Sequence, residues 1–411
     1  MKKKYSLVGL FLVSSLLLST TYLAASTSHH SELTRLSISP ISKSTTAQYE
    51  ISETLVISNN ADFALLGASG VGTSSDPYTF ENLYISSNDT CILIQDTTAY
   101  FVISNCRFES DAAYGSVWFS NVENGKIAMC EFGLESIAGW SDIATGVYLS
   151  AVRDCSVEES LFYNCWNGVR LWDTSNCTVT RNQIHSNHKG VLLEHAVHCD
   201  VLNNSIYSNS DYGVYIDLLS HNNSIYGNSI GWNGGIINQK NAINMGGNNT
   251  FDDGISIGNL WSDYNESVSY VIPGGGNSTD EYAQLLEDNV NPTISPPEDL
   301  VVDVDAVGNV LTWQASDRFP VRYTIEQDML EVVSATWGGD AISFNLDDLH
   351  QGTHTILLMV FDGEGNSAAD AVLITAVSFI LGGIGTELVM IASAITLSIF
   401  IVVTVLIKKL S

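Results

Sequence analysis

Hydrophobic and polar positions in the middle of the chain follow one phrase that recurs about every 22 residues. A glycine opens a short segment in which hydrophobic and polar residues alternate, and a polar turn leads to a second segment that contains Asn-x-Ile. The opening segments read Gly146-Val-Tyr-Leu149, Gly168-Val-Arg-Leu171, Gly190-Val-Leu-Leu193 and Gly213-Val-Tyr-Ile216. A fixed period of this length, built from short alternating segments, indicates a solenoid.

The residue types of the repeat predict strands. β-branched residues alternate with polar ones, and the turns consist of Asn, Ser, Asp and Gly, which accept left-handed backbone conformations. One such unit cannot bury its hydrophobic side alone, but it can do so when equivalent strands stack about 4.8 Å apart. We therefore expect an all-β fold, a right-handed parallel β-helix of about 8 coils over residues 76–285, including a C-terminal cap.

Residues at equivalent positions should form columns along this helix. Val147 and Leu149 begin two inward hydrophobic columns, and Asn182, Asn204 and Asn228 belong to an inward polar column. Each Asn can satisfy backbone groups at a turn and hydrogen-bond to the Asn of the next coil. Two outward columns are expected: Trp118, Tyr148, Arg170, Leu192 and Tyr215 in the first, and Tyr163, His185 and Tyr207 in the second.

The two ends of the chain carry export and membrane signals. Three lysines, an apolar run from Leu7 to Leu18 and small residues before position 27 indicate a secretory signal peptide over residues 1–26. Residues 388–407 carry no charge and are long enough to span a bilayer, and the lysines of the tail 408–411 should remain cytoplasmic. The sequence thus predicts a single-pass type I membrane protein at the cell surface, with its N-terminal region outside.

Three further segments complete the expected organisation. Residues 27–75 are interpreted as a spacer and an N-terminal cap, because a terminal coil must be covered. In residues 291–377 the period is lost, and seven alternating segments separated by Gly, Asp and Pro predict a β-sandwich without cysteine. Residues 378–387 would be a juxtamembrane linker.

The charge of the chain limits its partners. Its 411 residues include 45 acidic and 16 basic ones, for a formal net charge of −29. Such a surface repels nucleic acid and anionic lipid, and it chiefly serves solubility. The sequence predicts no cofactor, although an acidic surface can bind a divalent cation such as Ca²⁺. Seven glycosylation sequons fit an exported protein: Asn88, Asn176, Asn203, Asn222, Asn248, Asn265 and Asn277.

Several motifs resemble a known family. The run Gly70-Val-Gly-Thr-Ser-Ser-Asp-Pro-Tyr78, the repeats, and Gly258-Asn-Leu-Trp-Ser-Asp-Tyr264 together resemble NosD-like, carbohydrate-binding and sugar-hydrolase type β-helix proteins, including archaeal surface proteins. This resemblance implies that Trp261 and Tyr264 cover the last coil. The phrases Thr312-Trp313 and Val360-Phe-Asp-Gly-Glu-Gly-Asn366 resemble immunoglobulin-like or PKD-type stalk modules.

Catalytic groups are sparse. Cleavage of a polysaccharide on a β-helix needs converging carboxylates, or bound Ca²⁺ with a basic residue, on one outer face. Asp252 and Asp253 are the only adjacent carboxylates near the coils, and they fall in an irregular region. They are weak catalytic candidates.

Histidine and cysteine residues are candidate metal ligands in this chain. His195, His198 and His221 occur at neighbouring turns and are weak candidates for a copper site, without a close His-x-His spacing. Cys155, Cys177 and Cys199 recur every 22 residues and should stack inward. They would act chiefly as small apolar filler, with a disulfide or a soft metal site as alternatives.

The outward aromatic residues are the better indication of function. Aromatic side chains along a rigid face can stack on sugar rings or on a protein partner, although cross-strand packing explains them equally well. We select Trp118, Tyr148, Arg170, Tyr215, Tyr163 and Tyr207 as the predicted stacking residues. The first hypothesis is a non-catalytic, adhesin-like glycan- or partner-binding protein or an envelope protein. A polysaccharide lyase or glycoside hydrolase and a copper-handling NosD-like protein are the alternatives.

Overall fold

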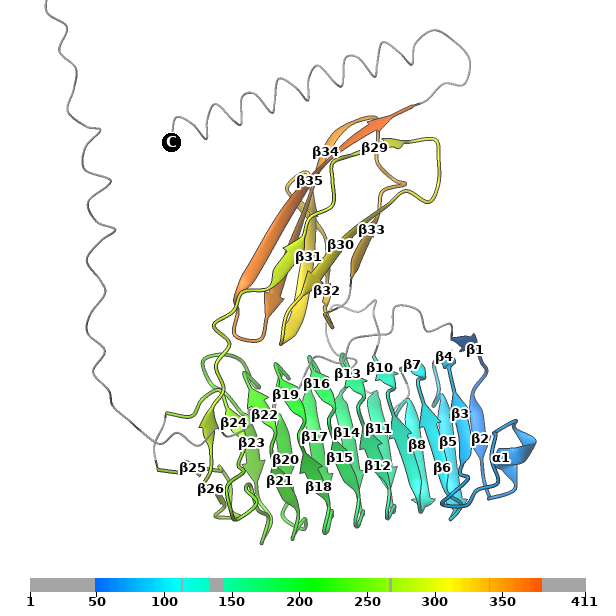
Figure 1. Cartoon of the computed structure of the whole chain (residues 1–411), viewed down its shortest axis with the longest axis vertical. Coiled ribbons are helices and arrows are strands. Elements are labelled where there is room, and N and C mark those ends of the chain that lie inside the picture. Colours follow the sequence, from blue (N-terminus) through cyan, green and yellow to red (C-terminus); the bar gives the residue numbers. More distant parts are fainter. Residues whose placement is uncertain (1–48, 112–113, 134–143, 266–267, 340, 379–411) are drawn as a thin grey trace, which may run out of the picture. The chain divides into compact units, whose positions relative to one another are not determined.

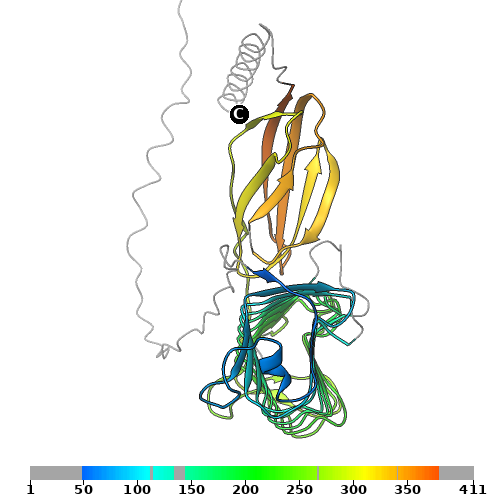
Figure 2. The same ribbon diagram turned by 90° about the vertical axis from the view of Figure 1, so that its right-hand side faces the viewer.

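The computed structural model describes residues 49–111, 114–133, 144–265, 268–339 and 341–378. Most of them form a stack of coils in which the chain passes through three β-sheets in every turn (Figure 1). Figure 2 looks along the stack and shows the successive coils superimposed. The expected parallel β-helix of about 8 coils is confirmed.

In the central coils each of the three sheets takes one strand per coil, and all pairings between coils are parallel. The first sheet has ten strands: β1 (Glu50–Ile51), β4 (Leu83–Ser87), β7 (Arg107–Ser110), β10 (Glu131–Phe132), β13 (Leu161–Phe162), β16 (Gln183–His185), β19 (Ser205–Tyr207), β22 (Ser229–Gly231), β24 (Leu260–Trp261) and β27 (Gln284–Leu285). The second sheet has eight: β2 (Leu55–Ile57), β5 (Ile92–Thr97), β8 (Val117–Val122), β11 (Thr145–Ser150), β14 (Asn167–Trp172), β17 (Lys189–Glu194), β20 (Val214–Ile216) and β23 (Ala242–Asn244). The third sheet has seven: β3 (Tyr78–Glu81), β6 (Phe101–Ser104), β9 (Gly125–Ala128), β12 (Ser156–Glu158), β15 (Thr178–Thr180), β18 (Asp200–Leu202) and β21 (Ser224–Tyr226).

The inward columns form the core of the stack. Val147 pairs with Val169 and Leu149 with Leu171, and all four side chains are fully buried. On the first sheet the inward side chain changes from phenylalanine to isoleucine along the stack, with Phe162 paired to Ile184. Neighbouring phenylalanines stack face to face, as Phe132 and Phe162 do with ring centroids 4.6 Å apart. Because each coil repeats the same inward positions, one continuous core runs through the stack.

Buried asparagines cap the turns of this core. In the central coils, the residue before each ladder position has a left-handed backbone, with φ of 49° at Glu159, 55° at Arg181, 58° at Asn203 and 71° at Gly227. Such a turn leaves backbone groups without partners inside the coil, and the buried Asn that follows, or Ser160 after Glu159, binds them. Asn182, for example, donates from Nδ2 to the carbonyl of Val157 at 2.9 Å. Asn182 thus satisfies backbone groups at a turn, as the sequence predicted.

The N-terminal end begins earlier than the sequence suggested. We expected coils from residue 76, but β1 and β2 already pair with β4 and β5. Helix α1 (Asp62–Leu65, blue in Figure 2) carries the fully buried Phe63, whose ring lies 5.0 Å from that of Tyr78. These first strands lack the Gly-Val phrase, so the repeat did not reveal them.

At the C-terminal end, the closing motif continues the first sheet before it ends the stack. Trp261 lies in β24, is fully buried, and stacks on Tyr270 at 4.3 Å. Its indole Nε1 donates to Oδ2 of Asp280 at 2.9 Å, and Asn259, the last ladder residue, donates to the same oxygen. A short antiparallel pair, β25 (Tyr270–Val271) and β26 (Thr279–Asp280), follows this coil.

A second β unit follows the stack, with a strand at each segment expected between residues 291 and 377. Its strands are β28 (Thr293–Ser295), β29 (Leu300–Asp303), β30 (Val310–Ser316), β31 (Pro320–Gln327), β32 (Leu330–Thr336), β33 (Ile342–Asn345), β34 (Gly352–Asp362) and β35 (Ser367–Val377). They form a three-stranded and a five-stranded sheet around a core that includes Trp313 and Trp337. The immunoglobulin-like or PKD-type assignment of this unit stays a prediction.

The expected membrane and export segments lie outside the described residues. These segments are the signal peptide 1–26, the transmembrane helix 388–407 and the tail 408–411, together with most of the linker 378–387. Among the residues that the structure describes, no helix has the length and apolar character needed to cross a bilayer.

Candidate functional site

The outward side of the second sheet holds the predicted aromatic column. The strand register places Trp118 beside Tyr148, Tyr148 beside Arg170, Arg170 beside Leu192, and Leu192 beside Tyr215. These five side chains come from five successive coils, because equivalent residues of neighbouring coils stack in a parallel solenoid. We call this column and the charged side chains around it the aromatic face.

The rings of this face pack against one another. Tyr114 stacks on Trp118 with centroids 4.7 Å apart, Trp118 stacks on Tyr148 at 6.0 Å, and both pairs are within 17° of parallel. The guanidinium of Arg170 covers the other side of Tyr148, 4.9 Å from its centroid. Tyr148 is therefore only 9% exposed. A flat surface for a sugar ring is not available at Tyr148, and the prediction that it is an exposed stacking residue is wrong.

The second predicted column is buried more completely. His185 pairs with Tyr207 on the first sheet, and Tyr163, His185 and Tyr207 are 6%, 0% and 0% exposed. The Tyr207 hydroxyl donates to the carbonyl of Pro320 at 3.1 Å, and its ring contacts Phe319 edge-on at 5.2 Å. The expectation that Tyr163 and Tyr207 are exposed is wrong. Phe319 and Pro320 cover Tyr207, whereas Tyr163 stacks on His185 and donates its hydroxyl to Glu131.

Charged groups border the accessible part of the aromatic face. Nε of Arg170 donates to Oε2 of Glu194 at 2.7 Å, and both side chains remain about one-third exposed. Asp211 binds Nζ of Lys240 at 2.7 Å and Nζ of Lys189 at 3.1 Å. Partial burial alone would raise the pKa of Asp211, but the hydrogen bonds from the two lysines outweigh it and lower that pKa. Asp211 is therefore ionised at neutral pH.

Partly exposed aromatic rings lie next to these ion pairs. Tyr212 and Tyr215 meet edge to face at 5.6 Å, and Nζ of Lys240 lies 5.3 Å from the Tyr212 ring. Trp172, which pairs with Glu194 in the register, is among the exposed hydrophobic residues. The accessible part of the face therefore combines ring edges, a carboxylate–guanidinium pair and a carboxylate–ammonium pair. Sequence reasoning found Tyr215 and Arg170 but missed Trp172, Glu194 and Asp211, which lie one or more positions off the selected column.

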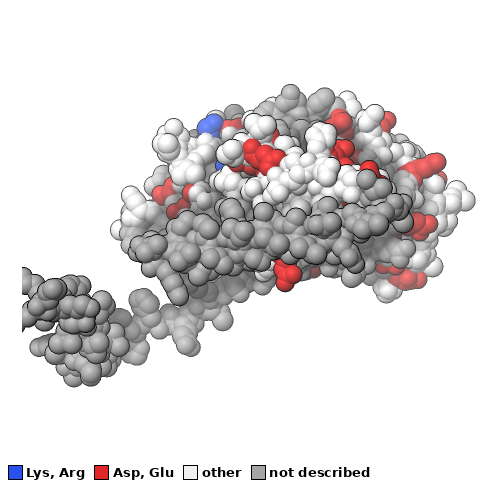
Figure 3. Space-filling view, turned by 90° about the horizontal axis from the view of Figure 1, so that it is seen from above, with Lys and Arg blue, Asp and Glu red and all other residues white. Residues whose placement is uncertain are grey.

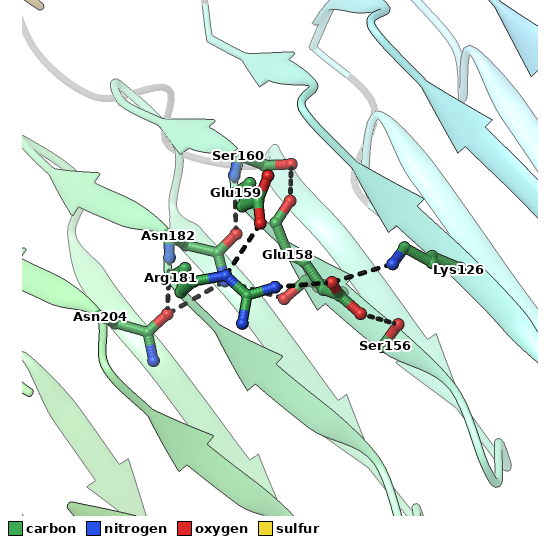
Figure 4. Close-up of polar contacts among 9 residues, drawn as sticks. Lys126, Ser156, Glu158, Glu159, Ser160, Arg181, Asn182 and Asn204 are labelled. Carbon is green, nitrogen blue, oxygen red and sulfur yellow. Dashed lines mark hydrogen bonds and ion pairs between the residues drawn. The ribbon is translucent and has the colours of Figure 1, made fainter. Parts of the chain in front are cut away.

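The third sheet carries a separate ion network (Figure 4). Glu158 binds Lys126 at 2.9 Å and Arg181 at 3.0 Å, while Arg181 also binds Glu159 at 2.9 Å. Partial burial would raise the pKa of Glu158, but the hydrogen bonds from Lys126 and Ser156 lower it. A carboxylate held ionised by two cations is a poor proton donor. This network is a cross-coil ion-pair ladder.

The two candidate catalytic aspartates stabilise a loop. Oδ1 of Asp253 accepts from the backbone N–H groups of Ile255, Ser256 and Ile257, and these bonds lower the pKa of Asp253. Asp252 accepts from the N–H of Gly254 and from that of Glu281. Their oxygens are directed to backbone groups and not to a shared substrate position.

Histidines and cysteines do not gather into a metal site. Within the described residues, one group of three potential ligands comes together, and it consists of Asp288, Asp317 and Asp362. His195, His198 and His221 are thus not brought together as copper ligands. Cys155, Cys177 and Cys199 are buried free thiols, as are the other four cysteines of the chain. Burial raises the pKa of Cys155 to about 12, as expected for inert filler.

A cavity of about 360 Å³ lies near the turns after the first sheet. Hydroxyl and amide side chains line most of it, with the guanidinium-bearing Arg322. Its wall includes Asn164, whose Oδ1 accepts from the hydroxyl of Thr336 at 2.7 Å. The lining contains neither a carboxylate nor an aromatic ring, so the cavity lacks the groups for acid–base chemistry.

Comparison with known proteins supports the β-helix fold of the coils. Three of the solved structures that this chain resembles are an alginate lyase from Paenibacillus sp. (11% identity, TM-score 0.38, 55% of this chain and 92% of that one), a DFA-IIIase from Arthrobacter chlorophenolicus A6 (11%, 0.33, 49% and 59%), and the A-module of the mannuronan C-5 epimerase AlgE6 of Azotobacter vinelandii (14%, 0.23, 51% and 65%). None of the curated proteins matches the sequence. Residues 67–230 match the family model described as "Right handed beta helix region". This segment is therefore a right-handed β-helix region, in agreement with the parallel three-sheet coils of the structure.

Proposed function

We propose that this chain is a non-catalytic, cell-surface protein that binds a glycan through the aromatic face. The observation that supports this most strongly is the arrangement around Arg170, Glu194 and Trp172. There a partly exposed ion pair lies beside an exposed indole on neighbouring strands. Planar charged groups bind adjacent hydroxyl groups of a sugar, and an indole packs on its C–H face.

The charge of the surface favours a neutral glycan. The chain has a formal net charge of −29, and acidic side chains outnumber basic ones on the face drawn in Figure 3. An acidic polysaccharide would be repelled by this surface. A neutral polysaccharide pays no such cost, and the rigid spacing of the coils suits a repeating chain.

Anchoring at the cell surface is part of the proposal. It rests on the sequence of residues 1–26 and 388–407, which combines an export signal with an uncharged segment of membrane-spanning length. In this arrangement the coils would face the exterior, where surface glycans occur. The sequons would then be open to glycosylation, since all seven asparagines are at least partly exposed.

A polysaccharide lyase or hydrolase is the alternative. The contacts of Asp252, Asp253 and Glu158 weigh against it, because each carboxylate is already bound by backbone groups or cations. The copper-handling alternative lacks a histidine cluster among the described residues. Release of reducing sugar or of unsaturated products from mixed polysaccharides by the purified chain would favour the enzyme.

A glycan array with the full-length chain tests the binding proposal. We expect neutral oligosaccharides to bind, and we expect Trp172→Ala and Arg170→Ala each to weaken binding about tenfold or more. Tyr226→Ala is the matched control, because Tyr226 is a partly exposed aromatic residue on the third sheet of the same stack. Equal binding by wild type, Trp172→Ala and Arg170→Ala would refute the proposed site.

A further inference from the structure

Three aspartates come together where the chain leaves the last coil. Asp288 follows β27, Asp317 lies in the turn between β30 and β31, and Asp362 ends β34. One carboxylate oxygen of each lies within 4.8 Å of those of the other two. The three residues are far apart in sequence, so the fold alone assembles this group.

Two of these carboxylates are buried, and each has one oxygen without a hydrogen-bond partner among the described residues. Asp288 and Asp362 are each 4% exposed. Oδ2 of Asp288 and Oδ2 of Asp362 have no hydrogen-bond partner among the described residues. Burying an ionised carboxylate without a partner costs several kcal/mol. A buried oxygen of this kind is normally bound to a proton, a hydrogen-bond donor or a metal ion.

Two other carboxylate oxygens of the cluster accept hydrogen bonds from the surrounding backbone. Oδ1 of Asp362 accepts from the N–H groups of Gly365 and Asn366 at 2.8 and 2.7 Å. Oδ1 of Asp317 accepts from the N–H of Phe319 at 2.7 Å. Nδ2 of Asn366 donates to the carbonyl of Asp288 at 2.8 Å. These bonds orient the carboxyl groups of Asp362 and Asp317 and hold the backbone of Asp288 beside them, and the Oδ2 atoms of Asp288 and Asp362 are left for another ligand.

We propose that Asp288, Asp317 and Asp362 form a Ca²⁺ site. The ion would be bound by Oδ2 of Asp288, Oδ2 of Asp362 and one oxygen of Asp317, with water completing its shell. Ca²⁺ suits this group because it accepts six to eight oxygen ligands in flexible geometry, whereas Mg²⁺ requires near-octahedral geometry. A carboxylate cluster without nitrogen or sulfur ligands also disfavours zinc and copper.

Binding would tie three chain segments together. The segment after β27 already contacts the loop after β34, where Oε2 of Glu364 accepts from the N–H of Asp288 at 3.2 Å. Next to the cluster, Leu286, Phe319 and Trp232 belong to one small hydrophobic group. The ion would replace repulsion among the carboxylates with a shared attraction, and it would thereby stabilise this junction.

Terbium luminescence tests the site with the full-length chain after treatment with EDTA. The ring of Trp232 lies directly against Gly363, the residue after Asp362, so excitation of Trp232 should sensitise bound Tb³⁺. We expect Ca²⁺ to displace Tb³⁺ from the wild type. Asp288→Asn and Asp362→Asn should each weaken Ca²⁺ binding roughly tenfold or more. Asp348→Asn is the matched control, because Asp348 is an exposed aspartate of the same β unit.

Two further measurements separate a metal site from a general effect on folding. Trp232→Phe should reduce Tb³⁺ emission but leave the Ca²⁺ affinity by calorimetry unchanged. In EDTA, Asp288→Asn should unfold at or above the wild-type temperature, since it removes a repulsive charge, whereas Ca²⁺ should raise only the wild-type temperature. If Ca²⁺ neither stabilises the wild type nor binds it more tightly than Asp362→Asn, the cluster holds shared protons and the proposal is overturned.

Discussion

Asn182 and Asn204, one coil apart, are joined by two hydrogen bonds to a single oxygen. Oδ1 of Asn204 accepts from the backbone N–H of Asn182 at 2.9 Å and from Nδ2 of Asn182 at 3.0 Å. Asn204 repeats the pattern with Oδ1 of Asn228 at 2.8 and 3.0 Å. Both asparagines are essentially inaccessible to solvent. Each side chain therefore satisfies groups of its own coil and of the next one.

Asn204→Ala should destabilise the stack by about 3 kcal/mol. The substitution removes the acceptor of the Asn182 N–H and the donor to the carbonyl of Val179, and both groups stay buried. Leaving a buried polar group without a partner costs more than a hydrogen bond gains. Chemical denaturation followed by circular dichroism measures the change in unfolding free energy.

Asn238→Ala is the control for this ladder variant. Asn238 is exposed in the segment after β22, so its loss should change the unfolding free energy by less than about 0.5 kcal/mol. A similar small loss for Asn204→Ala would mean that water replaces the ladder bonds.

Gly190→Ala should also destabilise the coils, by about 2 kcal/mol. A Cβ at this position would lie 2.5 Å from the carbonyl oxygen of Gly213 and 2.7 Å from Cγ2 of Ile206. Both neighbours belong to the next coil or the packed core and have little freedom to move. Gly247→Ala is the matched control, because nothing lies within 4 Å of the added atom there. Thermal unfolding of the two variants should differ clearly, and equal melting temperatures would contradict the steric argument.

The repeat predicted the inward-facing side chains of the coils, because every coil must fill the same continuous hydrophobic core. Val147, Val169 and their equivalents must fill one continuous core, so their pattern is visible without any long-range information. The period also predicted the asparagine ladder and the register of Trp118, Tyr148 and Arg170. Alternation assigns a side chain to the outward side of a sheet, but it does not tell what covers that side.

The parts that sequence reasoning missed depend on contacts outside the repeat. Tyr207 is outward and fully buried, because Phe319 and Pro320 cover it from more than a hundred residues away. Sequence reasoning also missed the aspartate cluster, because Asp288, Asp317 and Asp362 share no local motif and come together only in the fold. On the aromatic face, parallel stacking at the coil spacing turns ring faces toward each other, as between Trp118 and Tyr148.

The seven cysteines should be unreactive in the native protein at pH 8. All are buried free thiols, and burial raises the pKa values of Cys91, Cys155 and Cys165 to about 12. Hydrogen bonds from Cys177 and Cys130 lower the pKa values of Cys199 and Cys106, so these two thiols are protected by their complete burial and not by their pKa values. Thiol reagents attack the thiolate, and they do not reach it in the folded chain. Titration with a chromogenic disulfide should detect less than one thiol in the folded chain and seven after denaturation without reductant.

Asn238→Cys provides the positive control for this titration, because position 238 is exposed. One thiol should then react rapidly before denaturation. A denatured total of five in the wild type would reveal a disulfide and contradict the reduced column of Cys155, Cys177 and Cys199.

His185 should make the fold sensitive to mild acid. Its ring is fully buried between Tyr163 and Tyr207, with centroid distances of 6.2 and 5.0 Å. Among the described residues, Nε2 of His185 has no hydrogen-bond partner. Burial lowers the pKa of His185 to about 3, whereas a histidine in the unfolded chain titrates near about 6.5. Protonation is therefore favoured in the unfolded state and opposed in the folded one.

The direction of the pH effect follows from these two values. Above about pH 6.5 both states carry a neutral His185, and its contribution to stability does not change with pH. Between about pH 6.5 and pH 3 only the unfolded chain takes up the proton, so the folded state loses about 1.4 kcal/mol per pH unit from this residue.

His185→Phe keeps an aromatic ring between the two tyrosines and removes the titrating group. Its unfolding free energy should equal or exceed that of the wild type at pH 7.5, and the difference between the two proteins should grow as the pH falls to 4. Parallel pH profiles for the two proteins would show that His185 is protonated in the folded state or reached by water.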